Sequence, residues 1–178
     1  VEAHQTYQQA DFERSVIFVR DRYFVVADRI VSAVRDPRRF TWRLNGNAGR
    51  TAGGVFEIFA NGGRWQRDNA GVDVYLGSTS PALAMVEPDY FNGYAPYVHE
   101  FDRSRTVGHH AVLDGFVTDV DPGFLAVLAA YPMDGDQPAA HDPITVEPVL
   151  AKAGQVAWAV TTDAGTDFVM LRGVTADK

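Results

Sequence analysis

The middle of the sequence carries side chains of the types that move protons in enzymes: Tyr97, His99, His109 and His110. Histidine and tyrosine act as general bases and acids when they stand within hydrogen-bond reach of a substrate. His109 and His110 fall in a predicted strand, where neighbouring side chains point to opposite faces, so at most one of them can face a given cleft. All four are candidate catalytic residues. The alternative is that they are exposed or hydrogen-bonded side chains without a chemical role.

The stretch 89–105 that contains two of them is rich in aromatic residues, among them Tyr90, Tyr94 and Tyr97. It is too aromatic for a disordered linker, so we expect a structured loop. Its tyrosines could stack on sugar rings, but aromatic side chains also wedge a long loop onto a sheet. Both interpretations stay open.

Several other chemistries have no signature in the sequence. There is no cysteine, and the five histidines lack the H-x-H and H-E-x-x-H spacings of zinc sites. No Gly-x-Ser-x-Gly elbow is present, and Gly53-Gly54 and Gly62-Gly63 indicate turns and not a phosphate loop. We therefore predict neither a metal site nor a cofactor.

Composition indicates one globular domain over residues 1–178, because the chain is 46% hydrophobic and 22% charged. The net charge of −7 is uneven: residues 1–67 hold +4 and residues 68–178 hold −11. An acidic total argues against nucleic-acid binding, although the basic part could meet an acidic polymer locally. Alternatively, the arginines of residues 1–67 lie in solvent at strand edges, where they keep sheets from pairing with one another. No apolar run is long enough to predict membrane insertion. The first residues do not have the charged-then-apolar pattern of a targeting leader, so either none is present or it lies outside these residues.

Short β-branched and aromatic runs alternate with turn residues along most of the chain. Residues 15–31 predict a hairpin that turns at Arg20-Asp21-Arg22, and residues 39–44 alternate as a strand with one buried face. A second hairpin is predicted over 55–67, followed by a strand at 72–76 that continues through 83–86.

The second half of the chain predicts further strands at 106–120, 123–131, 144–150, 155–161 and 167–172, with a surface loop at 132–143. By composition alone, residues 124–131 could also be helical. About a dozen short strands predict an all-β fold, an antiparallel, supersandwich-like β-sandwich.

Three stretches, in this order, resemble the C-terminal sheet domain of heparinase II/III-like polysaccharide lyases. They are the hairpin from Phe12 to Ile30, which ends in Asp28-Arg29, then Trp42-Arg43-Leu44-Asn45-Gly46-Asn47, and then residues 124–128 with Tyr131-Pro132. In the second stretch Asn45 occupies the position of a family histidine. For Asp28-Arg29 we favour a structural role, in which charge-assisted bonds tie a strand end to a neighbouring loop.

The resemblance implies a domain that contacts substrate in a larger enzyme, with an upstream (α/α) toroid that is not visible here. Such lyases cleave uronic-acid-containing glycans by β-elimination, and a secreted or periplasmic location follows. The step needs a base, an acid and a cation or amide that neutralises the sugar carboxylate. The implied partner is an anionic polysaccharide, the isolated chain is expected to be inactive, and the implied substrate-binding residues are Trp42, Arg43, Asn45, Tyr90, Tyr94 and Tyr97.

Two functions of other classes compete with this interpretation. The first is a stand-alone carbohydrate-binding module without catalysis, which aromatic residues interleaved with Asn and Arg would suit. The second is a structural assembly domain whose apolar sheet face docks another chain, in which case the chain alone should associate.

Overall fold

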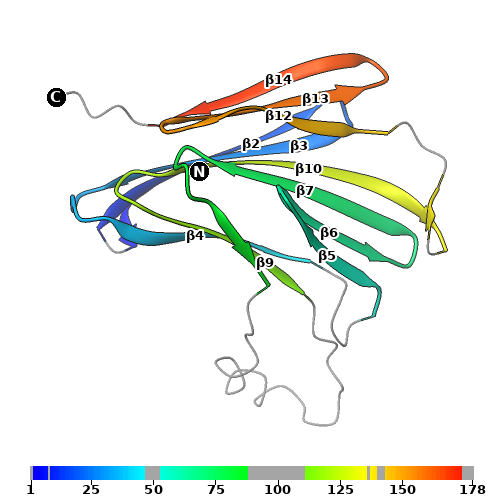
Figure 1. The fold of residues 1–178 in the computed structure, drawn as a ribbon, viewed down its shortest axis with the longest axis horizontal. Coiled ribbons are helices and arrows are strands. Elements are labelled where there is room, and N and C mark those ends of the chain that lie inside the picture. The colour runs from blue at the N-terminus through cyan, green and yellow to red at the C-terminus, as the bar shows by residue number, and fades with distance from the viewer. Residues whose placement is uncertain are drawn as a thin grey trace, which may run out of the picture.

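The computed structural model describes residues 2–7, 9–46, 53–87, 111–135, 137–139 and 143–173, and the regular structure within these ranges is β-strand. Three antiparallel sheets lie in layers, with the largest in the middle (Figure 1). No helix in the described ranges is long and apolar enough to cross a membrane. The predicted all-β, antiparallel sandwich is confirmed.

The middle layer, which we call the main sheet, has the strand order β1-β2-β3-β10-β7-β6-β5, and β11 pairs with β10. Its strands are β1 (Glu2–Tyr7), β2 (Ala10–Val19), β3 (Tyr23–Ser32), β5 (Val55–Phe59), β6 (Gly62–Arg67), β7 (Ala70–Ser78), β10 (Gly123–Asp134) and β11 (Gln137–Pro138). Two smaller sheets cover it from opposite sides (Figure 1). The β12–β14 sheet contains β12 (Thr145–Lys152), β13 (Gln155–Thr162) and β14 (Gly165–Arg172), and the β4–β9–β8 sheet contains β4 (Arg38–Asn45), β9 (Val112–Asp119) and β8 (Ala84–Val86).

Strand β10 lies in the centre of the main sheet and is buried on both faces. Phe124 and Ala126 join the core beneath the β4–β9–β8 sheet, while Leu125 and Val127 join the core beneath the β12–β14 sheet. A strand covered on both faces has an almost continuous apolar sequence instead of an alternating one. That is why composition alone could not separate strand from helix over residues 124–131.

The predicted hairpin at 15–31 is confirmed as β2 and β3. Arg20 and Asp21 adopt the left-handed backbone conformation, with φ of 49° and 54°, and the Arg22 amide donates to the Val19 carbonyl at 2.9 Å. Two successive residues at positive φ make the tight turn that suits the twist of a hairpin. The polar triplet was therefore the correct signal for the turn.

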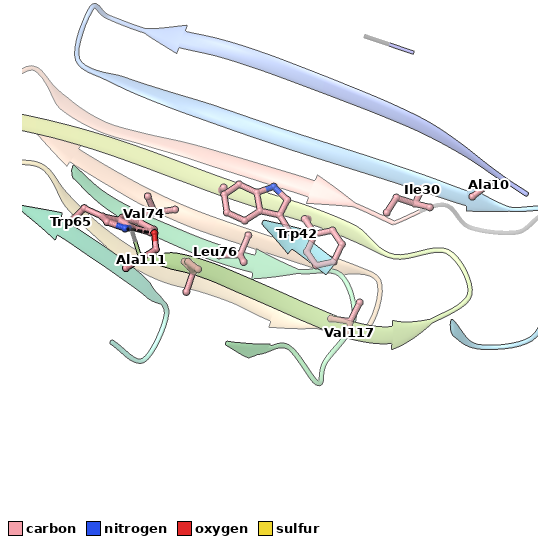
Figure 2. Packing of buried hydrophobic residues seen from close by; sticks show 11 residues of the cluster. Ala10, Ile30, Trp42, Trp65, Val74, Leu76, Ala111 and Val117 are labelled. Carbon is pink, nitrogen blue, oxygen red and sulfur yellow. Dashed lines mark hydrogen bonds between the residues drawn. The ribbon is translucent and has the colours of Figure 1, made fainter. Parts of the chain in front are cut away.

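The core beneath the β4–β9–β8 sheet contains two of the three tryptophans, Trp42 and Trp65 (Figure 2). The layers approach closely: a Cβ added at Gly115 of β9 would lie 2.1 Å from Leu76 Cδ2 of β7. A side chain at this position would force Leu76 to move, and core atoms are already in van der Waals contact. The third tryptophan, Trp158, packs in the core on the opposite side of the main sheet.

Several predicted boundaries need correction. Gly62 and Gly63 lie inside β6, because the turn of the second hairpin is formed by Ala60 and Asn61. Residues 83–86 do not continue β7 but form β8, which pairs with β9 in another sheet. Strand β10 extends to Asp134, and β11 follows within the predicted loop at 132–143. The tyrosine-rich segment 89–105 lies outside the described residues.

Candidate functional site

Strand β4 carries polar side chains on its outer side along its whole length. Phe40, Trp42 and Leu44 point inward and pack in the core, so the alternate residues point away from the main sheet. On β9, Phe116 lies opposite Thr41 and Asp114 lies opposite Arg43. We call this outward surface the β4 face, and its members are Arg39, Thr41, Arg43 and Asn45 of β4 with Asp114 and Phe116 of β9.

Two of the three site residues predicted on this strand lie together on the β4 face, and one does not. Arg43 and Asn45 are exposed and two positions apart. Trp42 is only 4% exposed and packs in the core (Figure 2). Its Nε1 has no hydrogen-bond partner among the described residues, whereas Trp65 Nε1 donates to the Ala111 carbonyl at 3.1 Å. We therefore assign Trp42 to packing, because a ring this deeply buried offers no face to a ligand.

The guanidinium of Arg43 binds the carboxylate of Asp114 with two parallel hydrogen bonds. Nε donates to Oδ1 at 2.8 Å and Nη2 donates to Oδ2 at 3.0 Å. The two residues are direct partners across β4 and β9, and Asp114 is only 3% exposed. This bidentate geometry is strong and specific. Much of the positive charge of Arg43 is thus neutralised within the sheet.

Arg39 is arranged differently, four residues earlier on the same strand. Its Cζ lies 3.8 Å from the centroid of the Phe116 ring, a close cation–π contact. No acidic side chain pairs with it among the described residues. Stacking on a ring orients a guanidinium and leaves its N–H edge directed at solvent, where it can meet a carboxylate or sulfate group.

Sequence reasoning did not select Arg39, although the signal was present. The alternation over residues 39–44 places Arg39 and Arg43 on one face once either is assigned to it. The sequence did not reveal which residues of β9 each arginine contacts. These contacts distinguish Arg39, which stacks on Phe116, from Arg43, which pairs with Asp114.

Asn45 ends β4, and the amide of the following Gly46 donates to the Ala111 carbonyl at 3.2 Å. The exposed side chain of Asn45 therefore stands at the end of the sheet where one described range ends at Gly46 and another begins at Ala111. The remaining predicted site residues lie outside the described residues: Tyr90, Tyr94, Tyr97, His99, His109 and His110. Within the described part of the chain, no group of three side chains could hold a metal ion.

The pair of Arg43 and Asp114 has two counterparts elsewhere in the fold. Arg14 of β2 binds Asp28 of β3 at 2.7 and 2.6 Å, and Arg64 of β6 binds Asp73 of β7 in the same bidentate manner. In each pair the two residues are direct cross-strand partners. Asp28 thus has a structural role, but its partner is Arg14 on the adjacent strand, not a neighbouring loop.

The tyrosines with perturbed titration are poor proton carriers at neutral pH. Burial, followed by the hydrogen bond to Asp167, raises the pKa of Tyr23 to about 12. Burial and the nearby Asp73 also raise the pKa values of Tyr75 and Tyr131 above their ordinary value. A general base needs a pKa near the working pH, so the described part of the chain offers cationic and hydrogen-bonding groups but no tyrosine poised as a base.

The sequence matches no model of a known protein family and no curated protein. Solved structures do match its fold. The heparinase III that is the BT4657 gene product aligns with a TM-score of 0.59 at 11% identity, over 96% of this chain and 25% of that chain. A second heparinase III aligns with a TM-score of 0.56 at 12% identity, over 96% of this chain and 25% of that one.

The heparan sulfate lyase HepC of Pedobacter heparinus, crystallised as a mutant, aligns with a TM-score of 0.57 at 13% identity, over 94% of this chain and 25% of the lyase. The chain thus spans about a quarter of the length of the solved chains that it matches. Identities this low carry the fold and not the activity. The resemblance to heparinase II/III-like lyases is confirmed in this sense: the chain has the fold of a domain-sized part of heparinase III and heparan sulfate lyase structures.

Proposed function

We propose that this domain is the substrate-contacting β-sheet part of a polysaccharide lyase that acts by β-elimination on a uronic-acid-containing glycan. The observation that carries the proposal is the alignment of 94–96% of the chain with heparinase III and the heparan sulfate lyase HepC. Because the chain corresponds to only a quarter of those chains, the proposal assigns most of the catalyst to another part of the enzyme, an (α/α) toroid. A secreted or periplasmic location belongs to the same proposal.

The cationic side chains of the β4 face support the proposal that the ligand is acidic. Arg39 and Asn45 are six residues apart, which is roughly 20 Å along an extended strand and leaves room for more than one sugar unit. Arg39 has an oriented guanidinium, and Asn45 adds an amide that can donate and accept. Arg43 lies between them and contributes less net charge, because Asp114 neutralises it. Uronic acid carboxylates and sulfate groups match these donors.

For the chemical step, the described residues provide only the group that would neutralise the sugar carboxylate. β-Elimination requires removal of a carbon-bound proton next to a carboxylate, and neutralising that carboxylate lowers the barrier. Arginine or asparagine on the β4 face could serve the carboxylate. The base and the acid are proposed among Tyr97, His99, His109 and His110 or in the other part of the enzyme. Without that part the isolated chain is expected to bind and not to cleave.

The test is binding of the 178-residue chain to a heparan sulfate oligosaccharide and to maltohexaose, measured by titration calorimetry at low and high salt. We expect binding of the acidic oligosaccharide alone, weakened by salt because exposed charges are screened. Arg39→Gln should lower the affinity about tenfold, the value of one hydrogen bond to a charged group. Arg172→Gln on β14 is the matched control, since it removes the same charge from an exposed position of the β12–β14 sheet.

Equal loss in both variants would mean that net charge alone drives binding, and binding of maltohexaose alone would favour the stand-alone carbohydrate-binding module. For the lyase activity, the full-length polypeptide should release products with the ultraviolet absorbance of an unsaturated uronic acid. An intact enzyme that binds the glycan without forming such products would contradict the lyase assignment while leaving the binding role in place.

A structural assembly domain remains the second candidate, because of one specific observation. On the outer side of the β12–β14 sheet, Phe168 is 72% exposed and Met170 is 51% exposed, and they stand two positions apart on the same face. Adjacent exposed apolar side chains often mark an interaction surface. A chain that stays monomeric in size-exclusion chromatography at high concentration would count against this candidate.

A further inference from the structure

A small cavity with both polar and apolar walls lies on the side of the main sheet opposite to the β4–β9–β8 sheet. Its volume is about 130 Å³, and its lining includes Arg64 of β6, Asp73 of β7 and Tyr131 of β10, with walls of Pro138, Pro143 and Ile144. Asp73 and Tyr75 share a face of β7, and Tyr75 packs with the core beneath the β12–β14 sheet. This cavity, the Arg64 pocket, is therefore separated from the β4 face by the main sheet.

Hydrogen bonds fix the polar side chains of the pocket. Arg64 donates to both oxygens of Asp73, from Nε at 2.7 Å and from Nη2 at 2.5 Å. The Tyr131 hydroxyl donates to Asp73 Oδ1 at 3.1 Å and accepts from Gln66 Nε2 at 3.1 Å. Because burial and Asp73 raise the pKa of Tyr131, this hydroxyl keeps its proton at neutral pH. The arrangement is therefore formed before any ligand arrives.

Hydrogen-bonding capacity remains open on this network. A guanidinium has five N–H groups, and Asp73 takes one from Nε and one from Nη2, so the Nη1 amino group of Arg64 has no partner among the described residues. An ionised carboxylate has about four acceptor sites, and the described residues occupy three of those on Asp73. The Arg64 side chain is 37% exposed, which means that solvent or a ligand can reach these groups.

The chemistry of the pocket selects its ligand. Arg64 and Asp73 cancel each other in charge, so neither an anion nor a cation finds an uncompensated partner. A hydroxyl group can accept from Arg64 Nη1 and donate to the free site on Asp73, and both functions are needed at once. The proline and isoleucine walls suit the C–H surface of a ring.

We infer that the Arg64 pocket binds a neutral sugar ring through its hydroxyl groups, at a site separate from the β4 face. It is a second glycan contact on the far side of the main sheet and does not depend on the lyase assignment. Its ligand class differs from that of the β4 face, because Arg39 of the β4 face has no acidic partner among the described residues, whereas Arg64 of the pocket is paired with Asp73.

The experiment is a nuclear magnetic resonance titration of the nitrogen-labelled chain with methyl glucoside, methyl galactoside and N-acetylglucosamine at millimolar concentrations. We expect at least one of them to shift the Arg64 Nε–H and Gln66 side-chain amide signals saturably. Arg64→Lys should lower that affinity at least fivefold, because lysine keeps the charge beside Asp73 but lacks the planar fork. The matched control is Arg14→Lys, the same change in the equivalent pair with Asp28, which should bind as the unchanged chain does.

If Arg64→Lys does not fold, as judged by its circular dichroism, Tyr131→Phe replaces it, with the same expected loss. The inference is overturned if none of the three sugars gives saturable shifts, or if the folded variant binds as well as the unchanged chain. It is also overturned if inorganic sulfate saturates these signals while the sugars do not, since the pocket would then be an anion site. Arg39→Gln should leave sugar binding unchanged, so failure of the β4 face and failure of the pocket can be told apart.

Discussion

The β4–β9–β8 sheet and the β12–β14 sheet are built alike on the inside and differ on the outside. Each is three-stranded and antiparallel, and each buries a tryptophan, Trp42 or Trp158, against the main sheet. On its outer side the first carries Arg39, Thr41, Arg43 and Asn45, whereas the second exposes Phe168 and Met170. Inner faces are constrained by packing to apolar residues, while outer faces are free to differ. The outer faces are therefore where separate functions should be sought.

The largest expected effect tests whether Trp42 and Trp158 anchor the two smaller sheets to the main sheet equally well. Trp42→Ala and Trp158→Ala should each lower the free energy of unfolding by about 3–5 kcal/mol, the usual result of truncating a buried aromatic side chain. Denaturation by urea measures both. Thr41→Ala, next to Trp42 on the outer side of β4, is the control and should change stability by less than about 0.5 kcal/mol. A small effect at either tryptophan would mean that the two sheets are not equally anchored.

A smaller effect should distinguish the two arginines of the β4 face. Arg43→Ala leaves the buried carboxylate of Asp114 without its bidentate partner and should cost about 1–3 kcal/mol. Arg39→Ala removes an exposed cation–π contact worth about 0.5–1 kcal/mol. Urea denaturation gives the stabilities, and calorimetry gives the affinities for an acidic oligosaccharide. If Arg43→Ala cost less stability than Arg39→Ala, the assignment of Arg43 to sheet structure would be wrong.

The third test concerns the contact that ties the β12–β14 sheet to the hairpin of β2 and β3. Tyr23 donates to Asp167 Oδ2 at 3.0 Å, and its folded pKa of about 12 lies above the ordinary value of 10. In this range the unfolded chain loses the proton first, so this part of the stability is complete below pH 10 and is lost as the pH rises toward 12. Tyr23→Phe should flatten that alkaline decline, as followed by urea denaturation at several pH values.

Asp167, the acceptor in the same contact, should make stability depend on pH at the acidic end of the range. Hydrogen bonds from Arg20 and Tyr23 lower the pKa of Asp167, so its contribution is present above the unfolded pKa of about 4 and is lost as the pH falls through the lower folded value. Asp167→Asn should remove this acid limb. An unchanged acid limb in Asp167→Asn would show that the contact does not contribute to stability.

The smallest expected effect lies on the outer side of the β12–β14 sheet. Phe168→Ser and Met170→Ser should change the free energy of unfolding by less than about 0.5 kcal/mol, because both side chains are already exposed. Size-exclusion chromatography of both variants and the unchanged chain should show less self-association after the substitutions if this face is an assembly surface. Identical elution of all three chains would remove that candidate.

Local chemistry was enough to predict most of the strands. The hairpin of β2 and β3 follows from a polar triplet between two β-branched runs. β13 and β14 follow from the predicted strands at 155–161 and 167–172. β8 could not be assigned correctly, since its pairing with β9 joins segments far apart in the sequence. The candidate site was predicted in part. The predicted site residues Arg43 and Asn45 lie on the outer side of β4, whereas Trp42, which was also predicted to bind substrate, is buried in the core.

By itself, the sequence determined the class of the fold, because the period of two and the turn residues are local properties of the chain. The identity of each arginine's partner was decided only in three dimensions. Arg43 meets Asp114 and Arg64 meets Asp73 because strand register places them directly opposite each other. Arg39 meets Phe116 diagonally, since the register places Phe116 opposite Thr41. Register depends on the packing of whole sheets, and it is this packing that separates an arginine that can receive a ligand from one that stabilises the sheet.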